Sequence, residues 1–196
     1  MATLTTKLEA VNSMLGHIGE APVNSISNSS TLPVSVSTAI SVIDEVSKEV
    51  QTEGWHFNTE VEVKYTPSNG AITIGTDIIQ FDTVDTNEDI VQRGSTLFDR
   101  KNNTTTFTSD LTVNQIRLLD WDSLPEVARR YITLKASRIF QGRIIGSKEL
   151  EQLIARDEYT ARANLLEADG QTSDRTIFDN YDAAVRVGIN RNYDIS

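Results

Sequence analysis

The chain has 196 residues, no cysteine and a formal net charge of −10. Without cysteine, neither disulfides nor thiolate zinc sites are available, and the acidic balance is opposite to what sequence-independent binding of nucleic acid requires. No apolar run approaches the roughly 20 residues that cross a membrane, and the N-terminal residues lack the basic and apolar regions of a signal peptide, so we expect a globular protein made in a reducing cytosol.

Two amphipathic helices are predicted in the first quarter of the chain. The first spans residues 3–18, with Thr5 or Thr6 as its N-cap, and ends at the GEAP sequence of residues 19–22. A connector rich in serine and asparagine, residues 24–32, follows it. Pro33 opens the second helix and Gly54 closes it. Each helix has one apolar face, and the second is expected to depend on packing because its many β-branched residues lower its intrinsic helix propensity.

The hydrophobic period changes at Trp55. Val61, Val63 and Tyr65 alternate with polar residues, which predicts a half-exposed strand whose outer face carries Glu60 and Glu62. Turn signals separate further short segments, and the sequence therefore predicts a compact antiparallel β unit. Its other predicted strands span residues 71–75, 77–81, 89–92, 96–98, 105–108 and 111–119.

The clearest helix in the sequence lies within residues 121–146. Ser123 and Glu126 form an S-x-x-E pattern typical of a capping box, and Gly142 or Gly146 can end the helix. Three interpretations of its basic residues remain open: binding of phosphate, ion pairs with acids of the next helix (Glu149, Glu151, Asp157 and Glu158), or contacts with a neighbouring subunit. The basic residues are Arg129, Arg130, Lys135, Arg138 and Arg143.

A fourth helix is predicted over residues 147–170. The predicted class is therefore α+β: a helical bundle of about four helices (1–54 and 123–170), an inserted antiparallel β domain (55–122) and an extended C-terminal arm (171–196). The β segment has 5 basic and 11 acidic residues, a net charge of −6, whereas residues 123–170 have 8 and 7. The arm either packs on its own domain, stays partly disordered, or orders on a partner through apolar anchors. The anchors are Phe178, Tyr181, Val187, Ile189 and Tyr193.

Motifs for chemistry are weak. His17 and His56 have no second ligand at metal-binding spacing, and the segment 85–89 resembles a calcium loop but has Ile90 where glycine is required. The sequence has no nucleophile elbow, P-loop or dinucleotide fingerprint. We therefore predict no catalytic residue, no metal site and no cofactor.

Several short motifs, in order, resemble the tail tubular protein A family of short-tailed bacteriophages. The resemblance runs from residue 8 to about residue 160 and does not extend to the arm. The motifs are LEAVN (8–12), IGEAPV (18–23), GWHFN (54–58), RG (93–94), FDR (98–100), LTVN (111–114), IRL (116–118), LPE (124–126), KAS (135–137) and Phe140.

This resemblance implies a structural protein of the virion tail, made in the cytoplasm of the bacterial host. Such proteins are head–tail adaptors, and the implied assembly is a dodecameric ring that joins the portal to the tail nozzle (tail tubular protein B). DNA would pass through its channel without specific binding, and an acidic lumen would repel the phosphates. The resemblance also implies that the arm and its five anchors reach the portal, and Arg129, Arg130, Arg138 and Arg143 become candidates for contacts with the portal or between subunits.

Two other functions remain open at the level of sequence. A tail-associated hydrolase of bacterial polysaccharide would need two carboxylates at a set separation, and the candidates are Glu60, Glu62, Asp120 and Asp122. A DNA-binding regulator would use the basic helix and would bind duplex DNA in a salt-sensitive way.

Overall fold

A computed structural model describes residues 4–27 and 31–172 of the chain. Within these residues it has four α-helices and small antiparallel sheets, so the predicted α+β class with an inserted β unit is confirmed. The helices are α1 (Lys7–His17), α2 (Val34–Thr52), α3 (Glu126–Ile144) and α4 (Lys148–Thr172). The strands are β1 (Thr59–Tyr65), β2 (Ile78–Thr83), β3 (Ile90–Arg93), β4 (Thr96–Asp99) and β5 (Leu111–Arg117), and single 3₁₀ turns span His56–Asn58 and Trp121–Ser123.

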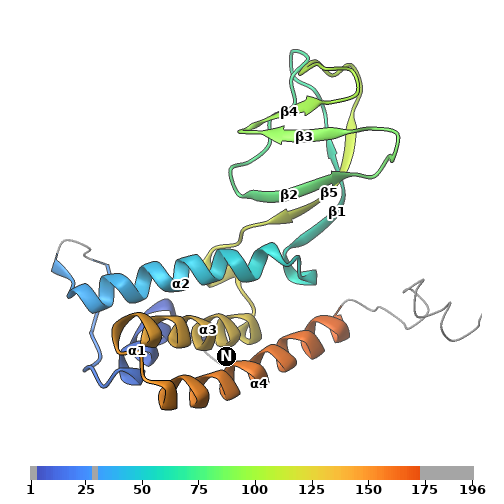
Figure 1. Ribbon diagram of the computed structural model, residues 1–196. Coiled ribbons are helices and arrows are strands. Elements are labelled where there is room, and N and C mark those ends of the chain that lie inside the picture. Colours follow the sequence, from blue (N-terminus) through green and yellow to red (C-terminus); the bar gives the residue numbers. More distant parts are fainter. Residues whose placement is uncertain (1–3, 28–30, 173–196) are drawn as a thin grey trace, which may run out of the picture.

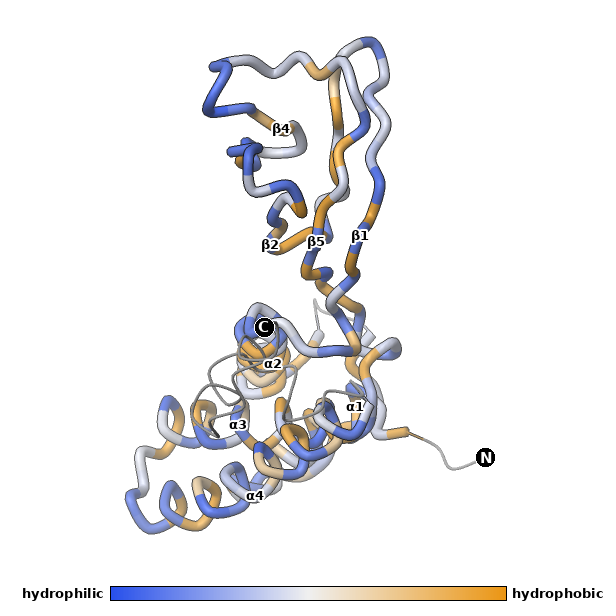
Figure 2. Tube along the Cα trace, turned by 90° about the vertical axis from the view of Figure 1, so that its right-hand side faces the viewer, coloured by the Kyte–Doolittle hydropathy of each residue, from blue (hydrophilic) through white to orange (hydrophobic). Residues whose placement is uncertain are grey.

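The elements form two units, which we call the helical unit (α1–α4) and the β unit (β1–β5). The β unit stands on the side of α2 that faces away from α3 and α4, and two chain segments connect the units (Figures 1 and 2). Each unit has its own hydrophobic cluster, one built from the helices and one from the strands and the loop before β2. The insertion therefore folds around its own core.

Helix α3 lies at the centre of the helical unit, since it packs against α1, α2 and α4. Its apolar residues Ile132, Ala136 and Phe140 are fully buried. At residues spaced three or four apart, α1 and α2 add much of the remaining core, including Val11, Met14, Leu15, Ala39, Ile43, Val46 and Val50.

The helix ends follow the predicted chemistry in part. Thr6 caps α1 in a full capping box with Glu9, and Gly54 and Gly146 adopt φ of 75° and 69° just after α2 and α3. The predicted capping box at Ser123 is wrong, because α3 begins after Pro125 and no side chain caps it. Glu126 instead accepts hydrogen bonds from the backbone N–H of Thr5, at 2.8 Å, and from its hydroxyl. The carboxylate therefore ties α3 to the segment before α1.

The β unit contains a three-stranded antiparallel sheet in the order β1-β5-β2 and a β3-β4 hairpin. The strands predicted over 71–75 and 105–108 are absent, and the described chain there makes only isolated bridges, such as Thr73 with Thr96. Tight turns at Gly70 and Asn103, both with positive φ, precede these two segments.

Strand β1 contains a bulge that the alternation of its sequence does not reveal. Glu60 pairs with Gln115 and Val63 with Val113, so Val61 and Glu62 together oppose the single residue Asn114. Glu62 has a φ of 56°, and its N–H donates to the Asn114 side chain at 3.0 Å. The bulge therefore turns the Val61 side chain toward solvent, where it is 69% exposed, and places Glu60 beside the buried Gln115. The predicted outward face shared by Glu60 and Glu62 is therefore wrong.

Candidate functional site: the joint and the charged surfaces

Two buried amide side chains hold the joint between the units. The side chain of Gln51, at the end of α2, donates to the Leu119 carbonyl at 3.1 Å and accepts from the Leu119 N–H at 2.7 Å. The Asn58 amide donates to the carbonyls of Gln51 and Arg117, and its oxygen accepts from the Trp55 N–H. Because both segments that cross between the units are bound to the same two side chains, the joint is a fixed connection rather than a free linker.

Aromatic packing and a contact from α4 complete this joint. Trp55 is 4% exposed, and its indole N–H donates to the Val50 carbonyl at 2.7 Å. The residues Trp55, Phe57, Leu119 and Trp121 pack into the helical cluster, although the boundary predicted from sequence assigned them to the β domain. The backbone N–H of His56 donates to the Asp169 carboxylate of α4 at 2.7 Å. Helices α2 and α4 therefore both contact the base of the β unit.

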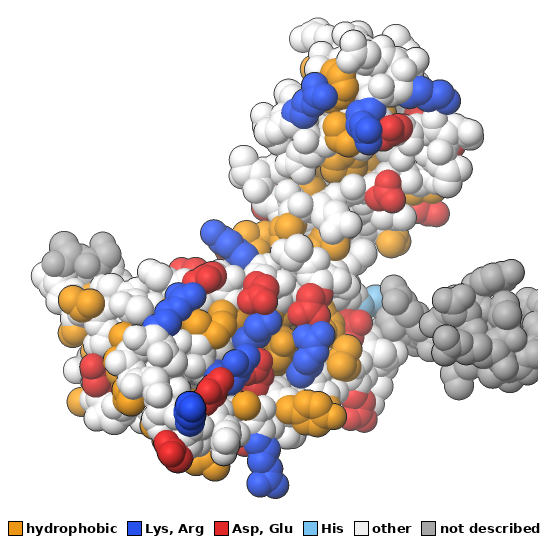
Figure 3. Space-filling view, in the orientation of Figure 1, with side chains coloured by type: hydrophobic (Ala, Val, Ile, Leu, Met, Phe, Trp, Pro, Cys, Tyr) orange, Lys and Arg blue, Asp and Glu red, His pale blue; other side chains and the backbone are white. Residues whose placement is uncertain are grey.

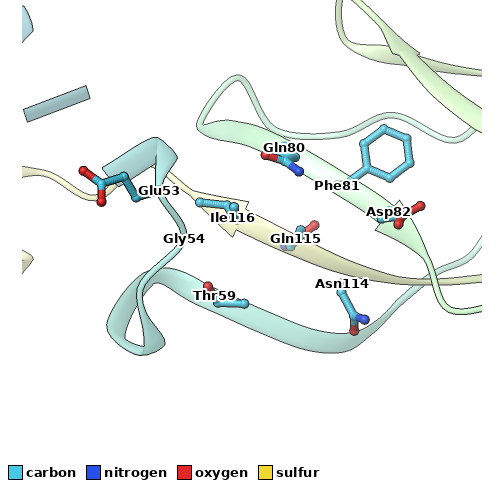
Figure 4. Close-up of a pocket in the computed structure, with 9 residues that line it drawn as sticks. All are labelled: Glu53, Gly54, Thr59, Gln80, Phe81, Asp82, Asn114, Gln115 and Ile116. Atoms are coloured by element: carbon cyan, nitrogen blue, oxygen red, sulfur yellow. The ribbon is translucent and has the colours of Figure 1, made fainter. Parts of the chain in front are cut away.

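A shallow hollow beside the joint is lined in part by Gly54 and Ile116 (Figure 4). Gly54 lies between α2 and the start of β1, with Ile116 of β5 facing it (Figure 4). A Cβ on Gly54 would lie 2.8 Å from the Ile116 Cδ1 atom, and its φ of 75° is a conformation that residues with a side chain rarely adopt. The close approach of the two segments thus depends on this residue.

The Arg129 side chain makes its contacts inside the subunit. It is 3% exposed, and its guanidinium donates to the carbonyls of Leu124, Thr5 and Asp122 at 2.8–2.9 Å. Planar guanidinium geometry suits three carbonyls that converge in this way. Arg129 therefore fixes the start of α3 to the segment before α1, and its expected contact outside the subunit remains a prediction.

Most other basic residues of α3 are paired with acids of the same subunit. Arg138 binds Glu158 of α4, as one of the three interpretations anticipated. Arg143 binds Glu45 with both terminal nitrogens at 3.0 and 3.2 Å, and Lys135 binds Glu49 at 3.1 Å. The partners on α2 were not predicted. Glu45 and Glu49 are four residues apart and so lie on one face of the helix, and this spacing is the sequence feature that could have indicated them.

A fourth ion pair joins α4 to α2. Arg162 donates to both Glu53 oxygens at 3.0 and 2.8 Å and to the Tyr131 hydroxyl at 2.9 Å. Basic and acidic side chains consequently alternate across this face of the helical unit (Figure 3). The pairs shift the titration of their members: hydrogen bonding from Arg143 lowers the pKa of Glu45, and hydrogen bonding to Glu158 raises the pKa of Arg138.

Arg130 differs from its neighbours on α3. It is exposed, and among the described residues its side chain has no hydrogen bond or ion pair. The basic helix thus presents one unpaired arginine, not a continuous basic strip, which weakens the phosphate-binding interpretation.

The carboxylates considered for a hydrolase lie in different surroundings. Glu60 binds the side chains of Gln115 and Arg117, at 2.6 and 3.3 Å. Glu62 lines a hollow of the β unit with Asp110 and Thr112, whereas Asp120 lines another hollow with residues of α1 and α2. Asp122 is exposed, and its carbonyl binds Arg129. The structure does not bring these four carboxylates into one hollow.

The segment that resembles a calcium loop is a turn. The Asp85 carboxylate accepts from the backbone and side-chain N–H groups of Asn87, at 2.8 and 2.9 Å. Among the described residues, no group of three or more His, Asp or Glu side chains is arranged to hold a metal ion.

The expected portal-binding residues Phe178, Tyr181, Val187, Ile189 and Tyr193 lie outside the described residues. In the part of the chain that the structure describes, no helix combines the length and apolar character needed to cross a membrane.

Comparison with known proteins identifies the family. A search of curated proteins returned no match. The family model for tail tubular protein matches residues 8–175 and so covers both units and the joint. Proteins of this family are structural components of the phage tail. Because this match spans well over half of the chain, from the second residue of α1 to beyond the end of α4, the chain belongs to the tail tubular protein family.

Proposed function

We propose that the chain is the subunit of a head–tail adaptor: a closed ring of twelve copies between the portal and the tail nozzle, through which DNA leaves the head. The observation that carries this proposal is the family match over residues 8–175. The resemblance noted in the sequence supports the finer assignment to a short-tailed bacteriophage.

The two-unit architecture suits an adaptor. We propose a helical domain (1–54 and 123–170), a β domain (55–122) and a C-terminal arm (171–196). The separate cores of the two units support a division into two domains, although Trp55, Phe57, Leu119 and Trp121 at the ends of the second range pack with the helices. A subunit with two cores and a fixed joint can bind one neighbour through each unit and keep a constant distance between them.

The charge of the subunit favours passage of DNA through a channel over binding of DNA. The β segment carries 11 acids and 5 bases, and the bases of α3 are largely neutralised by acids of α2 and α4. A channel wall with this balance repels phosphates, so a genome can slide past without binding.

Of the four arginines that we expected at contacts with the portal or between subunits, Arg130 supports the proposal best, because it alone among them is exposed and unpaired within the described residues. The arm residues Phe178, Tyr181, Val187, Ile189 and Tyr193 are proposed as anchors on the portal, since aromatic and branched side chains in a polar segment are typical of docking peptides.

Electron microscopy of the purified portal, with and without this protein, tests the proposal. We expect an added ring on one face of the portal, and we expect Tyr181→Ser with Tyr193→Ser to lower its occupancy by at least tenfold. A matched control is Lys48→Ser, an exposed change on α2 that should leave the ring intact. Portals that bind no added ring would contradict the adaptor role. Turnover of capsule or peptidoglycan that is abolished by Asp120→Asn or Glu62→Gln would support the hydrolase instead.

A further inference from the structure

One face of α4 is exposed along most of the helix. We call it the α4 stripe. It lies opposite the buried residues Ile154, Ala161 and Leu165, and its members recur at intervals of three or four residues, which places them on one side of the helix. The α4 stripe consists of Lys148, Gln152, Arg156, Tyr159, Ala163 and Leu166, all exposed.

The α4 stripe has the composition of a contact surface. Tyr159 is 78% exposed and Leu166 53% exposed, although both are large apolar side chains. Lys148 and Arg156 are the charged members, and within the described residues neither side chain has an ion pair or hydrogen bond. Elsewhere on α4, Arg162 is fully paired. An exposed tyrosine next to an unpaired arginine is typical of protein interfaces.

The β unit carries a surface of opposite charge. We call it the acidic hollow, and it is lined by Glu62, Val84, Asp85, Glu88, Asp110 and Thr112. Lys64 neutralises Asp110 at 2.7 Å, but Glu62 and Glu88 have no cationic partner among the described residues. Burial and the nearby carboxylates of Asp85 and Asp99 raise the pKa of Glu88. Val84, 43% exposed, gives the hollow an apolar wall.

We propose that the α4 stripe of one copy binds the acidic hollow of the next copy. Lys148 and Arg156 would neutralise Glu62 and Glu88, while Tyr159 and Leu166 would cover Val84. This inference rests on the proposed function, because it names the contact by which the ring closes.

Because of the way the two units are arranged, this contact forms between two copies of the chain and not within one subunit. In Figure 1, α4 lies on the side of the helical unit away from the β unit, with α2 and α3 between them. The fixed joint keeps the two surfaces apart within a subunit. A contact between two unlike surfaces repeats from copy to copy, and it forms a ring when the rotation closes.

Disulfide trapping tests the contact directly, because the chain has no cysteine of its own. The variant with both Tyr159→Cys and Val84→Cys replaces exposed side chains only, so the fold should be preserved. Assembled on the portal and mildly oxidised, it should give a ladder of covalent multimers on a non-reducing gel. Each single variant should give no ladder, and neither should Tyr159→Cys combined with Lys48→Cys.

Charge reversal provides an independent readout. Lys148→Glu with Arg156→Glu should raise the concentration needed for assembly by more than tenfold, and Glu62→Lys with Glu88→Lys should do the same. The variant with all four changes should regain assembly, since the attraction is restored with its sign inverted. The control Lys48→Glu should assemble like the parent.

The outcomes separate this inference from the adaptor role. A ring on the portal without a disulfide ladder, or without rescue by the fourfold variant, overturns the contact and leaves the adaptor intact. A parent protein that forms no ring overturns both. Salt-sensitive duplex binding that is lost in Arg156→Glu, with assembly unchanged, would assign the α4 stripe to DNA and also overturn the contact.

Discussion

At the scale of single residues, the joint depends on the absence of a side chain at Gly54. Alanine there would meet both a φ of 75° and the Ile116 Cδ1 atom at 2.8 Å. We expect Gly54→Ala to lower the free energy of unfolding by about 1–3 kcal/mol, measured by urea denaturation. Gly142→Ala is the control: nothing lies within 4 Å of its Cβ position, so stability should rise by up to about 1 kcal/mol. Equal effects of the two changes would contradict the role given to Gly54.

Neighbouring arginines of α3 offer a second comparison. Lysine at position 129 cannot reproduce the three hydrogen bonds of the buried guanidinium, so Arg129→Lys should cost about 2–4 kcal/mol of unfolding free energy. Arg130→Lys, at an exposed site without partners in the described chain, should change stability by no more than about 0.5 kcal/mol. Thermal and urea denaturation of both variants check the difference, and a reversed order would rule out the internal role of Arg129.

At the scale of elements, the bulge in β1 decides which valines form the core. Val61 is 69% exposed and Val113 on β5 is 1% exposed. Val61→Thr should therefore be neutral within about 0.5 kcal/mol, whereas Val113→Thr, which buries a hydroxyl, should cost about 1–3 kcal/mol. The measurement is the urea midpoint of each variant. A large loss at Val61 would mean that the strand alternates regularly.

The ion pair between α2 and α3 predicts a pH dependence. Hydrogen bonding from Arg143 lowers the pKa of Glu45 below that of an unfolded chain. The pair therefore stabilises the fold at pH values above the ordinary glutamate pKa of 4.5, and this contribution disappears as the pH falls through the lowered value. In an NMR titration, Arg143→Gln should return the Glu45 pKa to its ordinary range. An unchanged titration would show that the two side chains do not bind.

The elements also show how far the sequence predicts the structure. The hydrophobic period and the predicted helix ends located all four described helices, because Thr6, Pro33, Gly54 and Gly146 act on residues that are close to them in sequence. The capping box at Ser123 failed because Glu126 binds Thr5, which is distant in the chain. The face of Glu60 was misassigned because the bulge depends on the pairing with β5. Partners that lie far apart in sequence, such as Gln51 and Leu119 or Arg143 and Glu45, leave no local pattern.

At the scale of the whole molecule, two cores and a fixed joint place an α4 stripe and an acidic hollow at separate parts of one subunit. Lys148 and Arg156 of the stripe, and Glu62 and Glu88 of the hollow, have no partner of opposite charge within the described chain, and each pair has the charge that the other lacks. A ring of identical copies can pair the two surfaces at every contact.

The adaptor role is tested most directly by cryo-electron microscopy of the intact tail, at a resolution that shows helices. We predict a closed ring of twelve copies between the portal and the nozzle, with each copy matching both units in their present relative orientation. A tail that lacks this chain at that level, or that holds a single copy instead of a ring, would contradict the adaptor role.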